Sequence, residues 1–237
     1  PDLLKKVDMS LLHTIADMDS IPTGAFNIRK NGQGIARQSS ENITIEPKKG
    51  NPGIDIYIKP FTKGEEVHIP VIITETGIND KVYNDFYVGE GADVLIVAGC
   101  GIHNCGGEKT EHDGIHRFFI GKNAKVKYVE KHYGEGEGTG ERILNPVTEV
   151  TMEEGSYCEM EMIQLAGVDS TLRETEAALD ANSKIRSIPE ITANDADAQI
   201  VHEAAIGRIN NDQLLKLMTF GLTEEEAEEV IVSGFLK

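Results

Sequence analysis

Residues 100–116 gather several side chains that can bind metals or react with sulfur. The segment holds two of the chain's three cysteines, Cys100 and Cys105, and three of its seven histidines, His103, His112 and His116. Thiolate and imidazole suit zinc, iron and iron–sulfur clusters. On a strand, two residues that are two or four positions apart share a face. The spacing matches no standard zinc-finger or ferredoxin pattern, so a redox-active or persulfide-carrying cysteine and a glycine-rich loop with incidental histidines remain alternatives.

A second candidate site is the adjacent pair His202 and Glu203, which follows a strand-like apolar run. Both side chains can bind a metal or move a proton. The residue types alone favour a functional and a structural role about equally.

The chain beyond this pair is predicted to form a helical hairpin. Gly221 suits the left-handed position at the end of a first helix, and Thr223 and Glu226 have capping-box spacing for a second. The apolar stripe of the first helix consists of Leu214, Leu215, Leu217 and Met218. Two short amphipathic helices cannot bury both stripes in each other, so we expect the hairpin to pack on a larger body or on a partner. A simple C-terminal cap is the alternative.

Repeated segments indicate how these residues are positioned. The small residues Ala92, Ala124 and Ser156 recur at intervals of 32, and Ser183 follows after 27. Each comes after a polar turn that contains Gly or Asn and before a run of alternating residues. A fixed period of this size without a helical stripe predicts an all-β solenoid of stacked coils. An antiparallel jelly roll is the alternative fold.

The ends of a solenoid need cover, because unpaired strand edges aggregate. Apolar residues at helical spacing between Leu3 and Met18 predict an N-terminal helix that covers one end, and the hairpin would cover the other. The expected organisation is therefore a helical segment over 1–20, a β-helix core over 21–208 and a helical docking segment over 209–237.

Composition limits the classes of partner and the cellular compartment that we expect. A net charge of -17 disfavours nucleic acid, and no apolar run approaches the twenty residues of a membrane span. Three cysteines cannot all pair, which favours a cytoplasmic, reduced protein. Cys158 alternates with Glu and Met and is expected to fill the core. The glycine run at 134–140 lacks the Lys-Ser/Thr ending of a phosphate loop and carries acidic residues, so a mobile surface loop is expected.

Residues 188–237 resemble the C-terminal signature of the SufB/SufD family, scaffold proteins of iron–sulfur cluster assembly. Ile188-Pro189-Glu190-Ile191 resembles the family's Pro-containing strand, and His202-Glu203-Ala204 resembles the His-Glu-Ala of the SufB type. The repeats agree with the right-handed parallel β-helix that the resemblance implies.

The resemblance also implies a function. The chain would be a scaffold subunit without turnover of its own, handling iron and a transient iron–sulfur cluster. A SufC-like ABC-type ATPase would dock on 209–237, a desulfurase system would donate sulfur, and the chain would form a homodimer or a SufB/SufD-type heterodimer. An edge strand near 199–203 would suit homodimerisation. His202 and Glu203 fall on SufB-type positions implicated in building the cluster. Ligands or sulfur acceptors would come from Cys100, His103, Cys105, His112 and His116.

Two departures from the family pattern stand out. The SufB type carries a Cys shortly before the Ile-Pro-Glu segment, whereas Ser183-Lys184-Ile185-Arg186-Ser187 contains none. The chain also lacks at least one coil of about thirty residues. It is therefore either a compact variant or a chain from which a segment near 184–186 is missing.

Two other functions stay open. A β-helix hydrolase or lyase of polysaccharides predicts paired carboxylates along one exposed face and gives no role to the Cys/His segment. A structural zinc-binding β-solenoid predicts one tightly bound zinc ion and no sulfide.

Overall fold

The computed structural model describes residues 4–191, 197–202 and 211–235, with the side chains of 211–213, 228 and 231–235 excepted. The chain forms two compact units, residues 1–192 and 193–237. No helix in the described ranges is long and apolar enough to span a membrane.

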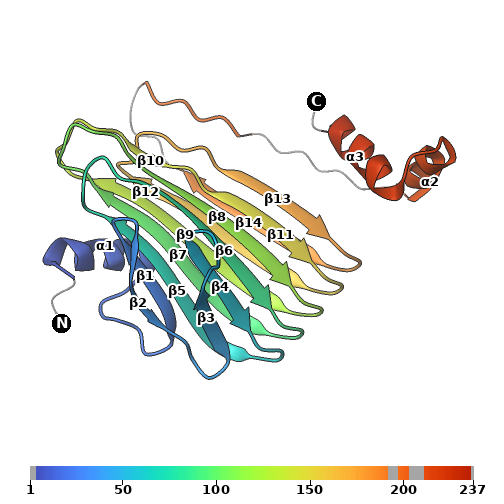
Figure 1. The fold of residues 1–237 in the computed structure, drawn as a ribbon, viewed down its shortest axis with the longest axis horizontal. Helices are drawn as coiled ribbons and strands as arrows, with labels where there is room; N and C mark the ends of the chain where they lie inside the picture. The colour runs from blue at the N-terminus through green and yellow to red at the C-terminus, as the bar shows by residue number, and fades with distance from the viewer. Residues whose placement is uncertain (1–3, 192–196, 203–210, 236–237) are drawn as a thin grey trace. The chain divides into compact units, whose positions relative to one another are not determined.

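The first unit contains two seven-stranded sheets (Figure 1). In spatial order the first sheet holds β14 (Lys184–Ile191), β12 (Tyr157–Ala166), β9 (Lys125–Glu135), β7 (Asp93–His103), β5 (Lys63–Ile73), β1 (Ala25–Lys30) and β2 (Gln33–Gln38). The second holds β13 (Glu174–Leu179), β11 (Val147–Met152), β8 (Thr110–Ile120), β6 (Asn79–Val88), β4 (Gly53–Ile58) and β3 (Ile43–Pro47), with β10 (Arg142–Leu144) paired to β8.

Successive coils add one strand to each sheet, and the strands of neighbouring coils are parallel. This arrangement is a β-solenoid, as the repeat predicts. The jelly-roll alternative is wrong, because it requires antiparallel neighbours along both sheets.

The repeat marks the turns between the sheets. Gly91, Asn123, Gly155 and Asn182 all have a positive φ, and each precedes one of the repeated small residues. The turns are also bonded to one another: the Gly91 N–H donates to the Lys122 carbonyl at 2.8 Å, and the Asn123 N–H donates to the Glu154 carbonyl at 3.0 Å. Phe61, with a φ of 62°, occupies the same position one coil earlier, a repeat that its bulky side chain conceals in the sequence.

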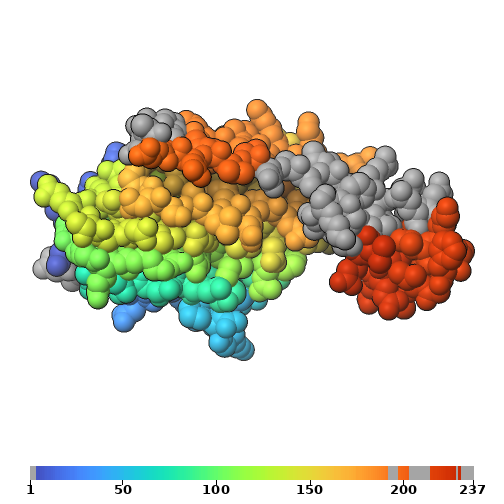
Figure 2. All heavy atoms as spheres, turned by 90° about the horizontal axis from the view of Figure 1, so that it is seen from above, coloured from blue at the N-terminus to red at the C-terminus, as the bar shows by residue number. Residues whose placement is uncertain are grey.

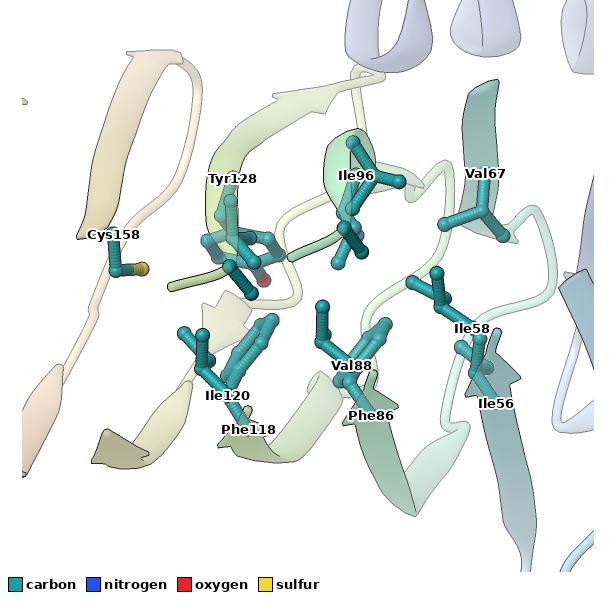
Figure 3. Close-up of a cluster of buried hydrophobic side chains, with 14 of the residues drawn as sticks. Ile56, Ile58, Val67, Phe86, Val88, Ile96, Phe118, Ile120, Tyr128 and Cys158 are labelled. Carbon is teal, nitrogen blue, oxygen red and sulfur yellow. The ribbon is translucent and has the colours of Figure 1, made fainter. Parts of the chain in front are cut away.

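Rows of apolar side chains, one from each coil, fill part of the interior (Figure 3). Phe86 and Phe118 stack with ring centroids 4.4 Å apart, and Tyr128 meets Phe118 edge-on at 4.9 Å. Each such pair contributes about 0.5–1.5 kcal/mol beyond its area burial. Cys158 is fully buried in the same cluster, which confirms its expected place in the core.

Helix α1 (Lys6–Ala16) packs on strands β5, β7 and β9. Its buried Leu11 and Ile15 lie against two glycines of β7. A Cβ on Gly99 would approach the Ile15 carbonyl oxygen to 2.5 Å, and one on Gly101 would meet Leu11 at 3.1 Å. The expectation that this helix covers an end of the solenoid is wrong, since the small residues of β7 create its seat on the face of a sheet.

The two ends of the solenoid differ. At the first end, β2 and β3 pair antiparallel with β1 and β4. At the other, every residue of β13 and most of β14 are exposed, and the last coil lies at the surface in Figure 2. β14 pairs residue by residue with β12 through Lys184, Ile185 and Arg186, so the strand is continuous there.

The expected edge strand near 199–203 is not found in the part that the structure describes. Residues 198–202 have no regular secondary structure, and Glu203 lies outside the described residues. An apolar run becomes a strand only where a neighbouring strand can pair with it, and within the described ranges β14 pairs with β12 and no other strand.

The second unit contains α2 (Asn211–Thr219) and α3 (Glu224–Phe235). Gly221 has a φ of 95° between them. The Thr223 N–H donates to Glu226 Oε2 at 2.8 Å, and the Glu226 N–H donates to Thr223 Oγ1 at 3.2 Å. The predicted hairpin and its capping box are confirmed.

Candidate functional site

The five predicted ligand residues fall into two groups. His103 ends β7 and Cys105 follows it in the loop to β8, at the surface. Cys100, His112 and His116 lie on β7 and β8 with buried side chains that line an internal cavity of about 20 Å³. Within the described residues, no three His, Cys, Asp or Glu side chains are placed to hold a metal ion. Metal binding by these five residues therefore remains a prediction.

The surface group extends beyond its two predicted members. His103 Nε2 lies 3.1 Å from Cys105 Sγ, and His103 Nδ1 lies 2.9 Å from Glu135 Oε1. Glu135 ends β9, whose register with β7 places it directly beside His103. The Tyr133 hydroxyl donates to Glu135 Oε2 at 3.2 Å. A thiol, an imidazole and a carboxylate thus form one hydrogen-bonded line.

The glycine run at 134–140 supports this surface group. The Gly138 N–H donates to the Asn104 carbonyl and the Gly140 N–H to the Gly106 carbonyl, each at 3.0 Å. A Cβ on Gly138 would lie 2.4 Å from the Gly106 oxygen, so only glycine fits there. The loop therefore packs on its neighbours, and its expected mobility stays a prediction. The glycines allow the loop to pack backbone to backbone against the segment that carries Cys105.

Asn104 holds the same segment from inside. Its buried side-chain amide donates to the carbonyls of Glu108 and Gly140, each at 3.0 Å, and its Oδ1 accepts from the Gly106 N–H at 2.9 Å. The backbone on both sides of Cys105 is therefore fixed, although the cysteine itself is exposed.

The interior group sits beside buried charges. His112 Nδ1 lies 3.2 Å from Asp80 Oδ2, and the other Asp80 oxygen accepts from Arg29 at 2.8 Å. Burial alone would raise the pKa of Asp80, but the hydrogen bonds and charges of His112 and Arg29 outweigh it and lower that pKa. Burial lowers the pKa of His116 to about 4, so this imidazole is neutral at pH 7. Its Nδ1 has no hydrogen-bond partner among the described residues.

Glu130 of β9 is the centre of the buried polar cluster. Arg173 Nη1 approaches Glu130 Oε1 to 2.6 Å as an ion pair, although its angles do not make a hydrogen bond. His132 Nε2 lies 3.1 Å from the same oxygen, and the Tyr128 hydroxyl donates to the other. Burial would raise the pKa of Glu130, but the charges of Arg173 and His132 hold it well below its usual value.

The three cysteines differ in their access to solvent. Burial raises the pKa of Cys100 well above its usual range and that of Cys158 to about 12. Both therefore stay protonated thiols inside the solenoid. Cys105 is exposed.

His202 is exposed and lies outside any helix or strand, and its predicted partner Glu203 is not among the described residues. A functional role for the pair remains a prediction.

Several residues of the site escaped sequence reasoning. Glu135, Glu130 and Arg173 lie far along the chain from residues 100–116, and only the register of the coils brings them close. The repeat carried the missing signal, because His103 and Glu135 occupy equivalent positions in coils 32 residues apart.

One pair of carboxylates on the outer face does not fit the polysaccharide alternative. Asp55 and Asp85 share Lys48 as a partner, and Arg117 binds both oxygens of Asp85 at 2.8 Å each. Glycoside hydrolysis needs one carboxyl group that can donate a proton and one that is free to attack or to activate water.

Comparison with known proteins gives a family match for the C-terminal part of the chain. Residues 166–235 match the family model described as the SUF system FeS cluster assembly SufBD core domain. A Pyrococcus horikoshii protein named as an iron–sulfur cluster assembly SufBD family protein is 41% identical over 63 residues, which is 27% of this chain and 19% of that protein.

Two relatives with the same family name are similar over more of the chain. That of Methanocaldococcus jannaschii is 26% identical over 88% of this chain and 89% of its own length. That of Archaeoglobus fulgidus is 26% identical over 73% of this chain and 66% of its own length.

The first of these alignments also bears on the missing coils. It spans 285 positions but takes in 88% of 237 residues, about 209, so about 76 positions are gaps in this chain.

Proposed function

Because the chain belongs to the SufB/SufD family of iron–sulfur cluster assembly proteins, we propose that it is a scaffold subunit that works with a SufC-like ABC-type ATPase. In this proposal the subunit has no turnover of its own, and the ATPase supplies the energy of conformational change. A nascent iron–sulfur cluster is its cargo.

The observation that carries the proposal is a set of exposed apolar side chains on the α2–α3 hairpin. Among the hairpin side chains that the structure describes, Leu214 and Ala227 are buried, and Leu217 and Leu222 pack against them. Phe220 is 73% exposed, and Leu215 is 59% exposed. Clustered exposed apolar residues on a small module are typical of a binding surface, which fits the docking of an ATPase on residues 209–237.

Replacing Phe220 with aspartate is expected to weaken binding to a purified SufC-type ATPase about thirtyfold. An exposed aromatic anchor at an interface typically contributes about 2 kcal/mol or more. Titration calorimetry measures the dissociation constant, with Glu224→Gln, an exposed change on α3, as the control. Leu214 is unsuitable, because it belongs to the hairpin's own core. Equal affinity for Phe220→Asp and the wild type, or no binding by the wild type, would contradict ATPase docking here.

For the cargo, we propose that the half-buried His103 and the exposed Cys105 are the first point of contact with iron or sulfur. Two side chains do not complete the four ligands of an iron–sulfur cluster, so the remainder must come from elsewhere. We propose a second subunit of this family as their source, with His202 and Glu203 at that interface. Cys100, His112 and His116 form a second predicted metal group, facing the internal cavity.

The sulfur itself is proposed to come from a desulfurase system. The exposed thiol of Cys105 supports this donor, because it can accept sulfur from another protein. The two buried thiols are shielded from another protein.

A further inference from the structure

The internal cavity lies between the two sheets and is lined by polar side chains from both. The first sheet contributes Cys100 from β7 and Glu130 and His132 from β9, and the second contributes His112 and His116 from β8. The cavity volume is about 20 Å³. One water molecule needs roughly 10–15 Å³ of such space, so the cavity has room for a single small molecule.

Gly114 of β8 makes this room. The inward-facing positions of the strand alternate, so that Gly114 lies between His112 and His116 on the same side. A Cβ on Gly114 would lie 2.8 Å from His116 Nε2 and 3.4 Å from His112 Nε2. Any side chain at this position would therefore push the His116 ring aside, and the glycine keeps space open beside two ring nitrogens.

Two polar atoms beside the cavity still need hydrogen bonds. His116 is buried, with 7% of its surface exposed, and its Nδ1 has no partner among the described residues. Glu130 Oε1 has close ion-pair contacts but no hydrogen bond of good geometry within the same ranges. Buried polar atoms in proteins are bonded to other protein groups or to ordered water, so both atoms indicate a small polar ligand.

The surroundings favour a neutral ligand over a metal ion. Glu130 already pairs with Arg173 at 2.6 Å, and Asp80, which contacts His112, pairs with Arg29 at 2.8 Å. In the described part of the chain, no three His, Cys, Asp or Glu side chains are placed to hold a metal ion. An ion would add a buried charge without a counter-charge, whereas a neutral molecule that both donates and accepts hydrogen bonds would not.

From this arrangement we propose that the cavity binds one water molecule, which bridges the two sheets between His116 on β8 and Glu130 on β9. The water donates a hydrogen bond to Glu130 Oε1 and completes the hydrogen bonding of the His116 ring. The inference goes beyond the proposed function, because it concerns the interior of the chain before any iron is bound.

A high-resolution crystal structure of the full chain, purified with a metal chelator, tests the site directly. It is expected to show one density peak within hydrogen-bond distance of His116 and Glu130, without anomalous scattering from a metal. An empty cavity, or a metal ion that stays in it despite the chelator, would overturn the proposal.

Magnetic relaxation dispersion of the water oxygen counts long-lived internal water molecules in solution. Two variants fill the cavity from opposite walls, Gly114→Ala from β8 and Ala98→Val from β7. Each is expected to lose one long-lived water relative to the wild type. Ala36→Val, the same substitution on β2 beside helix α1, should keep the wild-type number.

Circular dichroism and the thermal midpoint show which variants are folded. Loss of one water in either folded filling variant supports the bridge, and the wild-type number in a folded filling variant would contradict it. If neither variant folds, the crystal structure of the wild type decides. Binding of the ATPase is measured separately, so a failed water site leaves the proposed function standing.

Discussion

Replacing Glu130 with alanine is expected to lower the free energy of unfolding by about 3–5 kcal/mol, the usual cost of removing one partner from a buried ion pair. The change leaves the largely buried Arg173 without its counter-charge and the Tyr128 hydroxyl without its acceptor. Urea unfolding followed by circular dichroism measures the effect, since the chain contains no Trp to report by fluorescence.

Two variants show whether the loss comes from the unpaired charge. Glu159→Ala removes a carboxylate that pairs with Lys127 and Arg186 on the solvent side of β12, and a much smaller change is expected there. The double variant Glu130→Ala/Arg173→Ala should be more stable than Glu130→Ala alone. A Glu130→Ala protein within about 1 kcal/mol of the wild type would contradict this view of the cluster.

The second large effect is a loss of stability in mild acid. Burial lowers the pKa of His116 to about 4, whereas the same side chain titrates near 6.5 when the chain unfolds. Between these values the unfolded chain binds more protons than the folded one, so stability falls as the pH falls. At about 1.4 kcal/mol per pH unit, His116 alone removes about 2–3 kcal/mol between pH 6.5 and 4.5.

Unfolding free energies measured from pH 6.5 to 4.5 test this prediction. The lower limit avoids the range in which Glu130, whose pKa is well below its usual value, gains its own proton. His116→Phe should flatten the dependence but not abolish it, because burial also lowers the pKa of His132. His13→Asn, a change on the exposed side of α1, should leave it as in the wild type. An equal slope in His116→Phe would count against the buried neutral imidazole.

The sequence predicted the solenoid because its signal is periodic. The turns 89–92 and 121–124 share a first Gly and a last Ala. In both, the residue before the Ala is a Gly or Asn with a positive φ, which these two residue types adopt most readily. The capping box at Thr223 was predictable for a similar reason, since it depends on residues three positions apart.

The site was less predictable, because its members meet through the register of the coils. His103 contacts Glu135, which lies one coil later. Glu130 pairs with Arg173, which lies in a loop still further along the chain. Residues 100–116 appear as one cluster in the sequence, yet the alternation along β7 and β8 turns Cys100 and His112 into the interior. The exposed Cys105 follows the end of β7, where that alternation stops.

The seat of α1 was hidden for a different reason. Gly99 and Gly101 lie in or beside the Cys/His-rich segment, and their missing side chains make room for a helix. A glycine gives the same sequence signal for a turn, for close packing and for a ligand site, and only the neighbouring element distinguishes them.

Anaerobic reconstitution asks most directly whether this chain handles iron–sulfur clusters. The full chain, mixed with a SufC-type ATPase, ferrous iron and sulfide, is expected to develop visible charge-transfer absorption and to retain iron and acid-labile sulfide after desalting. Cys105→Ser should retain less of both, whereas Cys158→Ser should match the wild type. A chain that develops no absorption, or that retains tightly bound zinc without sulfide, would contradict a role as a cluster assembly scaffold.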